Sequence, residues 1–190
     1  YYYIELLHAA RTGNDFVGLF WRTPDNNTWT VINRNNLFSY TCPTCNIGCP
    51  LAIDPCVGMG GSFLREIWTG IGGFDISNLT NHARYPDQPD HLALDNFGTF
   101  EYANVSNYAQ RIRGFIQAPA TGTYRFNVTG DDDVQLFVSP TTNPNDKTLI
   151  ASINGFTTVN QHNKYNSQTS SDITLQEGHY YYVEILHKNN

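Results

Sequence analysis

Hydrophobic and polar residues alternate along several short segments of the chain, and a period of two is typical of half-buried β-strands. Gly, Pro, Asn and Asp cluster between these segments, where they supply turns. We find no convincing amphipathic helix. The pattern predicts strands at residues 1–8, 16–21, 29–32, 109–117, 122–128, 134–138, 148–153, 173–175 and 180–187.

The number and spacing of these strands predict an all-β fold, either a sandwich or a barrel. The composition agrees, because the chain has 12 Tyr, 11 Phe and 15 Gly among 190 residues. Aromatic and β-branched residues favour pleated sheets. This length allows one or two small domains with a real core, and the composition is typical of an extracellular or cell-surface protein.

One strand sequence occurs twice. Residues 1–8 read Tyr-Tyr-Tyr-Ile-Glu-Leu-Leu-His, and residues 180–187 read Tyr-Tyr-Tyr-Val-Glu-Ile-Leu-His. Because one domain has a single place for a given strand, we expect the two copies to belong to two domains. The chain would then be one period of a repeat, or one subunit of a head-to-tail polymer.

The charge of the chain restricts its partners. A formal net charge of -6 argues against nucleic acid and against an anionic membrane surface. No stretch approaches the ~20 consecutive apolar residues that span a bilayer, so no membrane insertion is expected.

The four cysteines, Cys42, Cys45, Cys49 and Cys56, lie in one Pro/Gly-rich stretch at 42–56. An even number of cysteines in a secretion-like composition favours two disulfides, with three possible pairings. A zinc site stays open as the alternative, because Cys42 and Cys45 have the spacing of a ligand pair. We expect this stretch to be a linker that is crosslinked to itself.

Sequons for N-glycosylation make Asn26, Asn78 and Asn104 the candidate glycan acceptors. A fourth sequon starts at Asn127, which lies inside an expected strand and is the least suited of the four. Catalytic patterns are missing: Glu66 and Glu184 form no defensible glycosidase pair, and no Gly-x-Ser-x-Gly motif is present. We therefore expect no enzyme. His187 ends the repeated strand, and we assign it a structural role.

Several stretches together resemble the PA14 family, the β-barrel module of toxin protective antigens, flocculins and many adhesins. The most specific is the Thr-Gly-Thr-Tyr-x-Phe sequence at 121–126, followed by consecutive aspartates. Others are 63–68 and 85–90, which look like the opening of the family, and 167–184, which looks like its close. The resemblance implies a PA14-like β-barrel or sandwich.

The order of the family's elements is rotated here, because residues 16–25 resemble the segment that follows the last Tyr-rich strand of the family. We therefore expect three parts: terminal strands at 1–41, a Cys-rich linker at 42–56, and a PA14-like domain without its last strands at 57–190. A neighbouring copy would supply the missing strands by β-augmentation, and such contacts propagate into a filament. The expected interface residues are Phe16, Leu19, Phe20 and Trp21.

The candidate ligand site is the run Asp131-Asp132-Asp133. Clustered carboxylates repel unless they are solvated or neutralised by a cation, and hard oxygen ligands suit Ca²⁺. In lectin members of the family, two aspartates joined by a cis peptide bind Ca²⁺ and present it to sugar hydroxyls. The resemblance assigns this role to Asp131 and Asp132, with Asn189 as a further ligand. The alternative is a solvated turn without a cation.

These observations lead to two functional hypotheses. The first is an extracellular structural or adhesive repeat that assembles head to tail by strand complementation. The second is a calcium-dependent carbohydrate-binding module of an adhesin, with glycans as partners.

Overall fold

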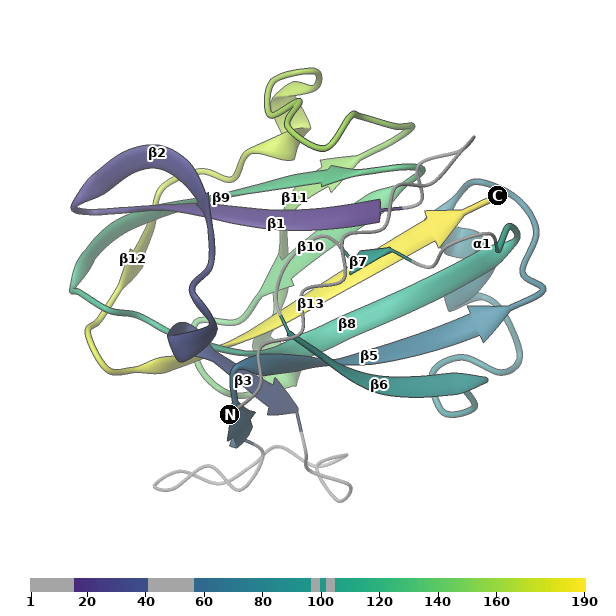
Figure 1. Cartoon of the computed structure of the whole chain (residues 1–190), viewed down its shortest axis with the longest axis horizontal. Helices are drawn as coiled ribbons and strands as arrows, with labels where there is room; N and C mark the ends of the chain where they lie inside the picture. Colours follow the sequence, from purple (N-terminus) through teal and green to yellow (C-terminus); the bar gives the residue numbers. More distant parts are fainter. Residues whose placement is uncertain (1–15, 41–56, 97–99, 102–104) are drawn as a thin grey trace, which may run out of the picture.

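The computed structural model describes residues 16–40, 57–96, 100–101 and 105–190. These residues form two antiparallel β-sheets that pack against each other around one apolar core (Figure 1). The all-β fold that the sequence predicts is thus confirmed.

The smaller sheet has five strands. Their order is β12 (Ile173–Leu175), β9 (Gly122–Gly130), β1 (Phe16–Thr23) and β2 (Asn26–Val31), and β7 (Phe100–Glu101) also pairs with β1.

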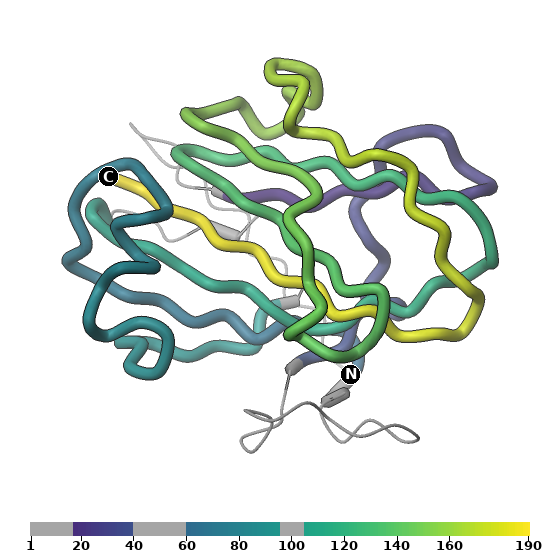
Figure 2. Tube along the Cα trace, turned by 180° about the vertical axis from the view of Figure 1, so that it is seen from behind, coloured from purple at the N-terminus to yellow at the C-terminus, as the bar shows by residue number. Residues whose placement is uncertain are grey.

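The larger sheet has eight strands. Its main path runs through β11 (Thr148–Ile153), β10 (Val134–Val138), β13 (Tyr180–Asn189), β8 (Tyr108–Gln117), β3 (Leu37–Tyr40) and β4 (Val57–Gly60). β5 (Ser62–Thr69) pairs with β8 as well, and β6 (His91–Asn96) pairs with β5. Seen from behind, β13 runs through the middle of this sheet between β10 and β8 (Figure 2).

The helical elements are short. They are α1 (Ile76–Thr80), η1 (Arg34–Asn36), η2 (Pro144–Asp146) and η3 (Asn166–Gln168).

The core lies between the two sheets, and the alternation of the strands builds it. Along β13, for example, Tyr181, Val183 and Ile185 point inward, where they join the same apolar cluster as Phe126 and Val128 of β9. Burial of such side chains stabilises a fold by roughly 25 cal/mol for each Å² of apolar surface that is removed from water.

The predicted strand positions agree well with the observed ones. β10, β11 and β12 have the predicted bounds, and the other predicted strands differ by a few residues at their ends. The sequence missed β3, β4, β5, β6, β7 and α1. β3, β4 and β7 hold too few residues to show a period, and β5 is buried along most of its length, so it shows no alternation. The strand that is predicted at 1–8 lies outside the described residues.

The expected exchange of strands between copies differs from what this single chain does. β1 pairs with β9 of the same chain, with Trp21 opposite Phe126, and residues 180–187 stay in the larger sheet. Leu19, Phe20 and Trp21 are therefore buried within this chain, and Phe16 is the first residue of the paired strand. Their role at an interface between copies stays a prediction. Without β1, one edge of β9 would expose unpaired backbone groups. In this chain, β1 satisfies them.

The two strands that flank the Cys-rich stretch lie next to each other. β3, which precedes it, and β4, which follows it, pair antiparallel, with Tyr40 opposite Val57. Both strands belong to the larger sheet, and a role of residues 42–56 as a linker between domains stays a prediction. The four cysteines of this stretch lie outside the described residues.

Candidate functional site

The run of three aspartates lies in the connection between the two sheets. It follows β9, a strand of the smaller sheet, and precedes β10, a strand of the larger one. Asp131 and Asp132 are partly buried, and the peptide bond between them is cis, as the family resemblance implies. Since His187 of β13 is opposite Val134 of β10, the end of β13 lies beside this loop.

Hydrogen bonds tie the loop to the end of β13. The backbone N–H of Asp132 donates to the Lys188 carbonyl (3.0 Å), and that of Lys188 donates to the Asp133 carbonyl (3.0 Å). The N–H of Asn190 donates to Oδ2 of Asp132 (3.1 Å). The fold thus brings Asp131, Asp132 and the end of β13 together at one end of the sandwich.

Asn189 is almost fully buried at this strand end. Its side-chain Nδ2 donates to the carbonyl of Val105 (3.4 Å). Since one side of the amide carries the nitrogen and the other the oxygen, this bond directs Oδ1 away from Val105. The structure describes no bond between Asn189 and the two aspartates.

Asp133 is not part of a solvated turn. Asp133 is 8% exposed, and its Oδ1 accepts a hydrogen bond from the backbone N–H of Gly155 (2.7 Å). Burial raises the pKa of this carboxyl, and the charges of Asp75 and Asp132 raise it further, while the nearby backbone of Ile76 acts in the opposite direction. Asp133 is therefore bonded to the loop after β11 and lies beside the start of α1, which follows β5.

The loops after β5 and β11 each carry an exposed phenyl ring. Phe74 precedes Ile76 by two residues and is 59% exposed, and Phe156 follows Gly155 and is 53% exposed. The first loop is also tied to the end of the chain, because the Gly73 N–H donates to Oδ1 of Asn190 (3.3 Å). Sequence analysis missed both rings, since no pattern in the sequence places them beside the aspartates.

A chain of buried polar side chains approaches the loop from inside the sandwich. Nε of Arg65 is 2.6 Å from Oε1 of Gln110, and Nε2 of Gln110 is 2.7 Å from Nδ1 of His187. Nε2 of His187 is in turn 2.7 Å from the backbone oxygen of Asp131. Burial lowers the pKa of His187 to about 4, so its ring is neutral at pH 7.

The Lys188 side chain is a buried cation next to the site. Its ammonium group donates to the backbone oxygen of Asn189. Burial lowers the pKa of Lys188 to about 8, against the opposing effect of the Asp132 charge. A positive charge is thus held close to the candidate cation ligands.

The donor set fits a hard cation. Two carboxylates and an amide oxygen are the ligand types that Ca²⁺ prefers, and they suit zinc or copper poorly. In the part of the chain that the structure describes, no group of three or more His, Cys, Asp or Glu side chains could hold a metal ion. A calcium site at this loop would use the side chains of Asp131, Asp132 and Asn189, with other oxygens completing the coordination.

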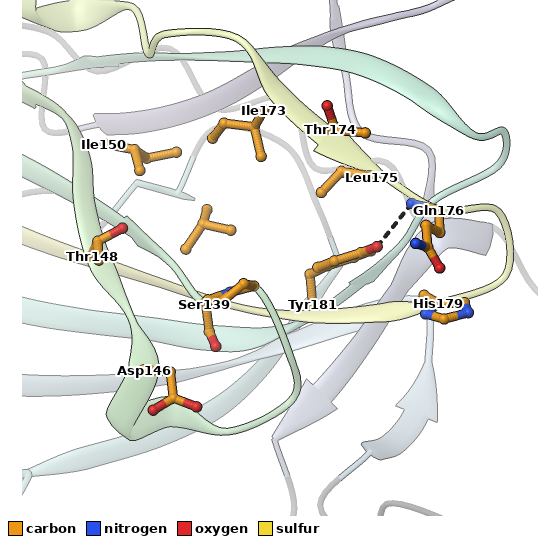
Figure 3. A pocket seen from close by; sticks show the side chains of 12 residues that line it. Ser139, Asp146, Thr148, Ile150, Ile173, Thr174, Leu175, Gln176, His179 and Tyr181 are labelled. Carbon is orange, nitrogen blue, oxygen red and sulfur yellow. Dashed lines mark hydrogen bonds between the residues drawn. The ribbon is translucent and has the colours of Figure 1, made fainter.

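A cavity of about 610 Å³ lies far along the strands from this loop (Figure 3). It opens between β11 and β12, the edge strands of the two sheets, and near the beginning of β13. Ile150, Ile173, Leu175 and Tyr181 make its wall largely apolar, and the Tyr181 hydroxyl accepts a hydrogen bond from the Gln176 N–H (2.8 Å). The cavity brings none of the candidate calcium ligands together.

The sequons fall in different environments. Asn26 and Asn78 are exposed, as glycan acceptors must be. Asn127 is buried and donates to the His162 carbonyl and to Thr169 Oγ1, in agreement with its low suitability. Asn104 lies outside the described residues.

Comparison with known protein families shows to which family this chain belongs. The model of the PA14 domain matches residues 95–190, which include β8 to β13 and the aspartate loop. The chain belongs to the PA14 family. The resemblance that the sequence motifs indicated is thereby confirmed.

Relatives of this PA14 chain are found in much longer proteins. Fibrocystin-L of Homo sapiens is 40% identical over 131 residues, which cover 67% of this chain and 3% of the relative. Fibrocystin-L of Mus musculus is 38% identical over a segment with the same coverage. An N-acetyl-beta-glucosaminyl-glycoprotein 4-beta-N-acetylgalactosaminyltransferase 1 of Mus musculus is 32% identical over 88 residues, which cover 44% of this chain and 8% of the relative.

The family and the two fibrocystin-L relatives support an extracellular or surface module of the adhesive or carbohydrate-binding type. In the described ranges, no helix is both long and apolar enough to cross a membrane.

Proposed function

We propose that this PA14 chain is an extracellular module that binds carbohydrate with the help of Ca²⁺. The observation that carries the proposal is the position of Asp131 and Asp132 at one end of the sandwich, bound to the end of β13. When bound, Ca²⁺ would offer open coordination positions to sugar hydroxyls. Asp131, Asp132 and Asn189 are the residues that would hold the ion.

The surroundings of the loop support a sugar as the ligand. A pyranose has polar hydroxyls along its edge and apolar C–H groups on its faces. The carboxylates suit the hydroxyls, and the exposed rings of Phe74 and Phe156 suit an apolar face. Asp133 bonds to the loop that carries Phe156 and lies beside the start of α1, which follows Phe74, so both loops adjoin the aspartate run. The 32% identical relative is, by its name, a transferase that acts on a glycoprotein, which also favours glycan recognition.

The experiment is a glycan array with the chain in calcium, repeated with a chelator. Glycan binding should require calcium, and Asp131→Asn/Asp132→Asn should abolish it while the protein stays folded. Asp146→Asn is the matched control, because it removes a carboxylate at the apolar cavity far from the loop. An array without ligands in calcium, or binding that survives chelation and the double substitution, would contradict the proposal.

Strand exchange between copies is the second candidate function, and the repeated octapeptide favours it. Residues 180–187 already lie between β10 and β8, so the same slot is closed to residues 1–8 of this chain. A second copy, in the same polypeptide or in another, could offer such a slot. Light scattering at increasing concentration tests this, because head-to-tail assembly would give growing oligomers and a self-contained chain would stay at 21.5 kDa.

A further inference from the structure

We propose that Arg65, Gln110 and His187 form a positioning chain, which holds the peptide group between Asp131 and Asp132 in one orientation. This inference rests on the proposed function in one respect only: the two carboxylates so held are those of the candidate calcium site. The hydrogen bonds of the positioning chain are present in the protein without any ligand.

The three residues occupy positions that normally belong to the core. Gln110 of β8 is opposite both Ile67 of β5 and His187 of β13, and all three strands are neighbours in the larger sheet. Other inward positions of these strands carry Phe63, Ile112 and Ile185. Arg65 is 6% exposed, and Gln110 and His187 are fully buried. Buried polar groups are costly unless they are hydrogen-bonded, so this set needs a connected network.

The direction of every hydrogen bond in the network follows from its arginine end. A guanidinium can only donate, so Oε1 of Gln110 faces Arg65 and its NH₂ group faces His187. The amide NH₂ also only donates, so Nδ1 of His187 is the acceptor and the ring proton is on Nε2. That N–H then donates to the Asp131 carbonyl, which can only accept. Asp95 anchors the outer end through an ion pair with Arg65 (3.1 Å).

Both polar atoms of one peptide group are thereby held by consecutive residues of β13. The carbonyl of Asp131 accepts from the His187 ring, and the N–H of Asp132 donates to the Lys188 carbonyl at 3.0 Å. Fixing this plane fixes the positions of both aspartate Cα atoms relative to β13, and the two side chains leave from these atoms. Partners that orient metal ligands in this indirect way typically account for about 10- to 100-fold in metal affinity.

The test compares His187→Leu, which removes the donor, with His187→Gln, whose amide can still donate to the Asp131 carbonyl. Three quantities are measured: the ¹⁵N shifts of the imidazole without ligand, hydrogen exchange of the Asp132 amide in chelator, and the Kd for Ca²⁺ by calorimetry. We expect an Nε2–H tautomer in the unmodified protein. His187→Leu should speed exchange at Asp132 by about tenfold or more and weaken calcium binding by about 10- to 100-fold, while His187→Gln stays close to the unmodified protein.

A second pair of variants keeps the test open if His187→Leu fails to fold. Gln110→Met leaves His187 in place but removes the amide that holds its ring from the other side, so the ring should turn more freely and Asp132 exchange should rise. Gln117→Met is the control, because it removes a glutamine from the opposite end of the same strand. An Nδ1–H tautomer in the unmodified protein, or exchange at Asp132 that Gln110→Met leaves unchanged, would overturn the inference. If the unmodified protein binds no Ca²⁺, the proposed function fails, and the tautomer and exchange data still decide the positioning chain.

Discussion

Nε2 of His187 lies 2.7 Å from the backbone oxygen of Asp131, so a core residue of β13 touches the loop that joins the two sheets. The end of the Tyr-rich strand therefore does more than complete a sheet. The His187 side chain and the backbone of the next residues hold the aspartate loop, while Asp133 bonds to the loop after β11. The site is built from segments of β9, β13 and the loops after β5 and β11.

Removing the Asp133 carboxylate should destabilise the fold. Asp133→Ala leaves the N–H group of Gly155 without its acceptor, so the free energy of unfolding should fall by about 1–3 kcal/mol. Urea denaturation measures this. Asp87→Ala, at an exposed position, should change the value by less than about 0.5 kcal/mol. Equal stability of the two variants would show that the hydrogen bond from Gly155 to Asp133 does not stabilise the fold.

Stability should decrease in mild acid because His187 is buried in its neutral form. Its pKa falls from 6.5 to about 4 on folding, so below pH 6.5 the unfolded chain binds a proton that the folded chain does not. This contribution is fully present above pH 6.5 and is lost as the pH falls to about 4, which amounts to about 3 kcal/mol. Denaturation at pH 7, 5.5 and 4 measures the loss. The same series on His187→Gln should be flatter in this range, and identical pH profiles would contradict the assignment.

Replacing the buried cation should strengthen calcium binding, if the proposed site is correct. Lys188→Met removes a positive charge beside the candidate ligands, and even in water two like unit charges about 4 Å apart repel by about 1 kcal/mol. The Kd for Ca²⁺ should then fall by about fivefold. Lys164→Met, in the loop that carries Phe156, is a comparison at an exposed position. Weaker binding in Lys188→Met would mean that the ammonium supports the ligand geometry.

Shortening a core residue of β1 distinguishes pairing within the chain from pairing between copies. Leu19→Ala should lower the free energy of unfolding by about 2–5 kcal/mol, because the side chain is fully buried in the core. Asn27→Ala, at an exposed position of β2, should have little effect. For a self-contained chain the thermal midpoint is independent of protein concentration. A midpoint that rises with concentration would indicate that β1 completes another copy.

The cysteines should form two disulfides, and the sandwich should survive their reduction. Alkylation with and without reductant, followed by intact mass measurement, should show four thiols that react only after reduction. Since the pairing of β3 with β4 already closes this segment, reduction should leave the core packed and its circular dichroism unchanged. Zinc that stays bound during gel filtration under native conditions would favour a zinc site of the four cysteines instead.

The sequence by itself determined the all-β class, the family and most strand positions. The bounds of β10, β11 and β12 could be read directly, because the period of two is a local property of the backbone. The motif at 121–126 and the consecutive aspartates gave the family, and the family gave the candidate ligands. Local patterns carried this information because each depends on residues that are close in sequence.

The partners of these elements were decided by the tertiary structure. Alternation shows which residues of β1 face a core, but it is the same whether β9 belongs to this chain or to another. His187 looks like an ordinary strand end in the sequence, since its partner Gln110 is 77 residues away. Asp133 looks like its two neighbours, although it is buried against the Gly155 amide and they are partly exposed. Hydrogen-bond partners and burial depend on contacts between distant segments, and only packing of the two sheets fixes those contacts.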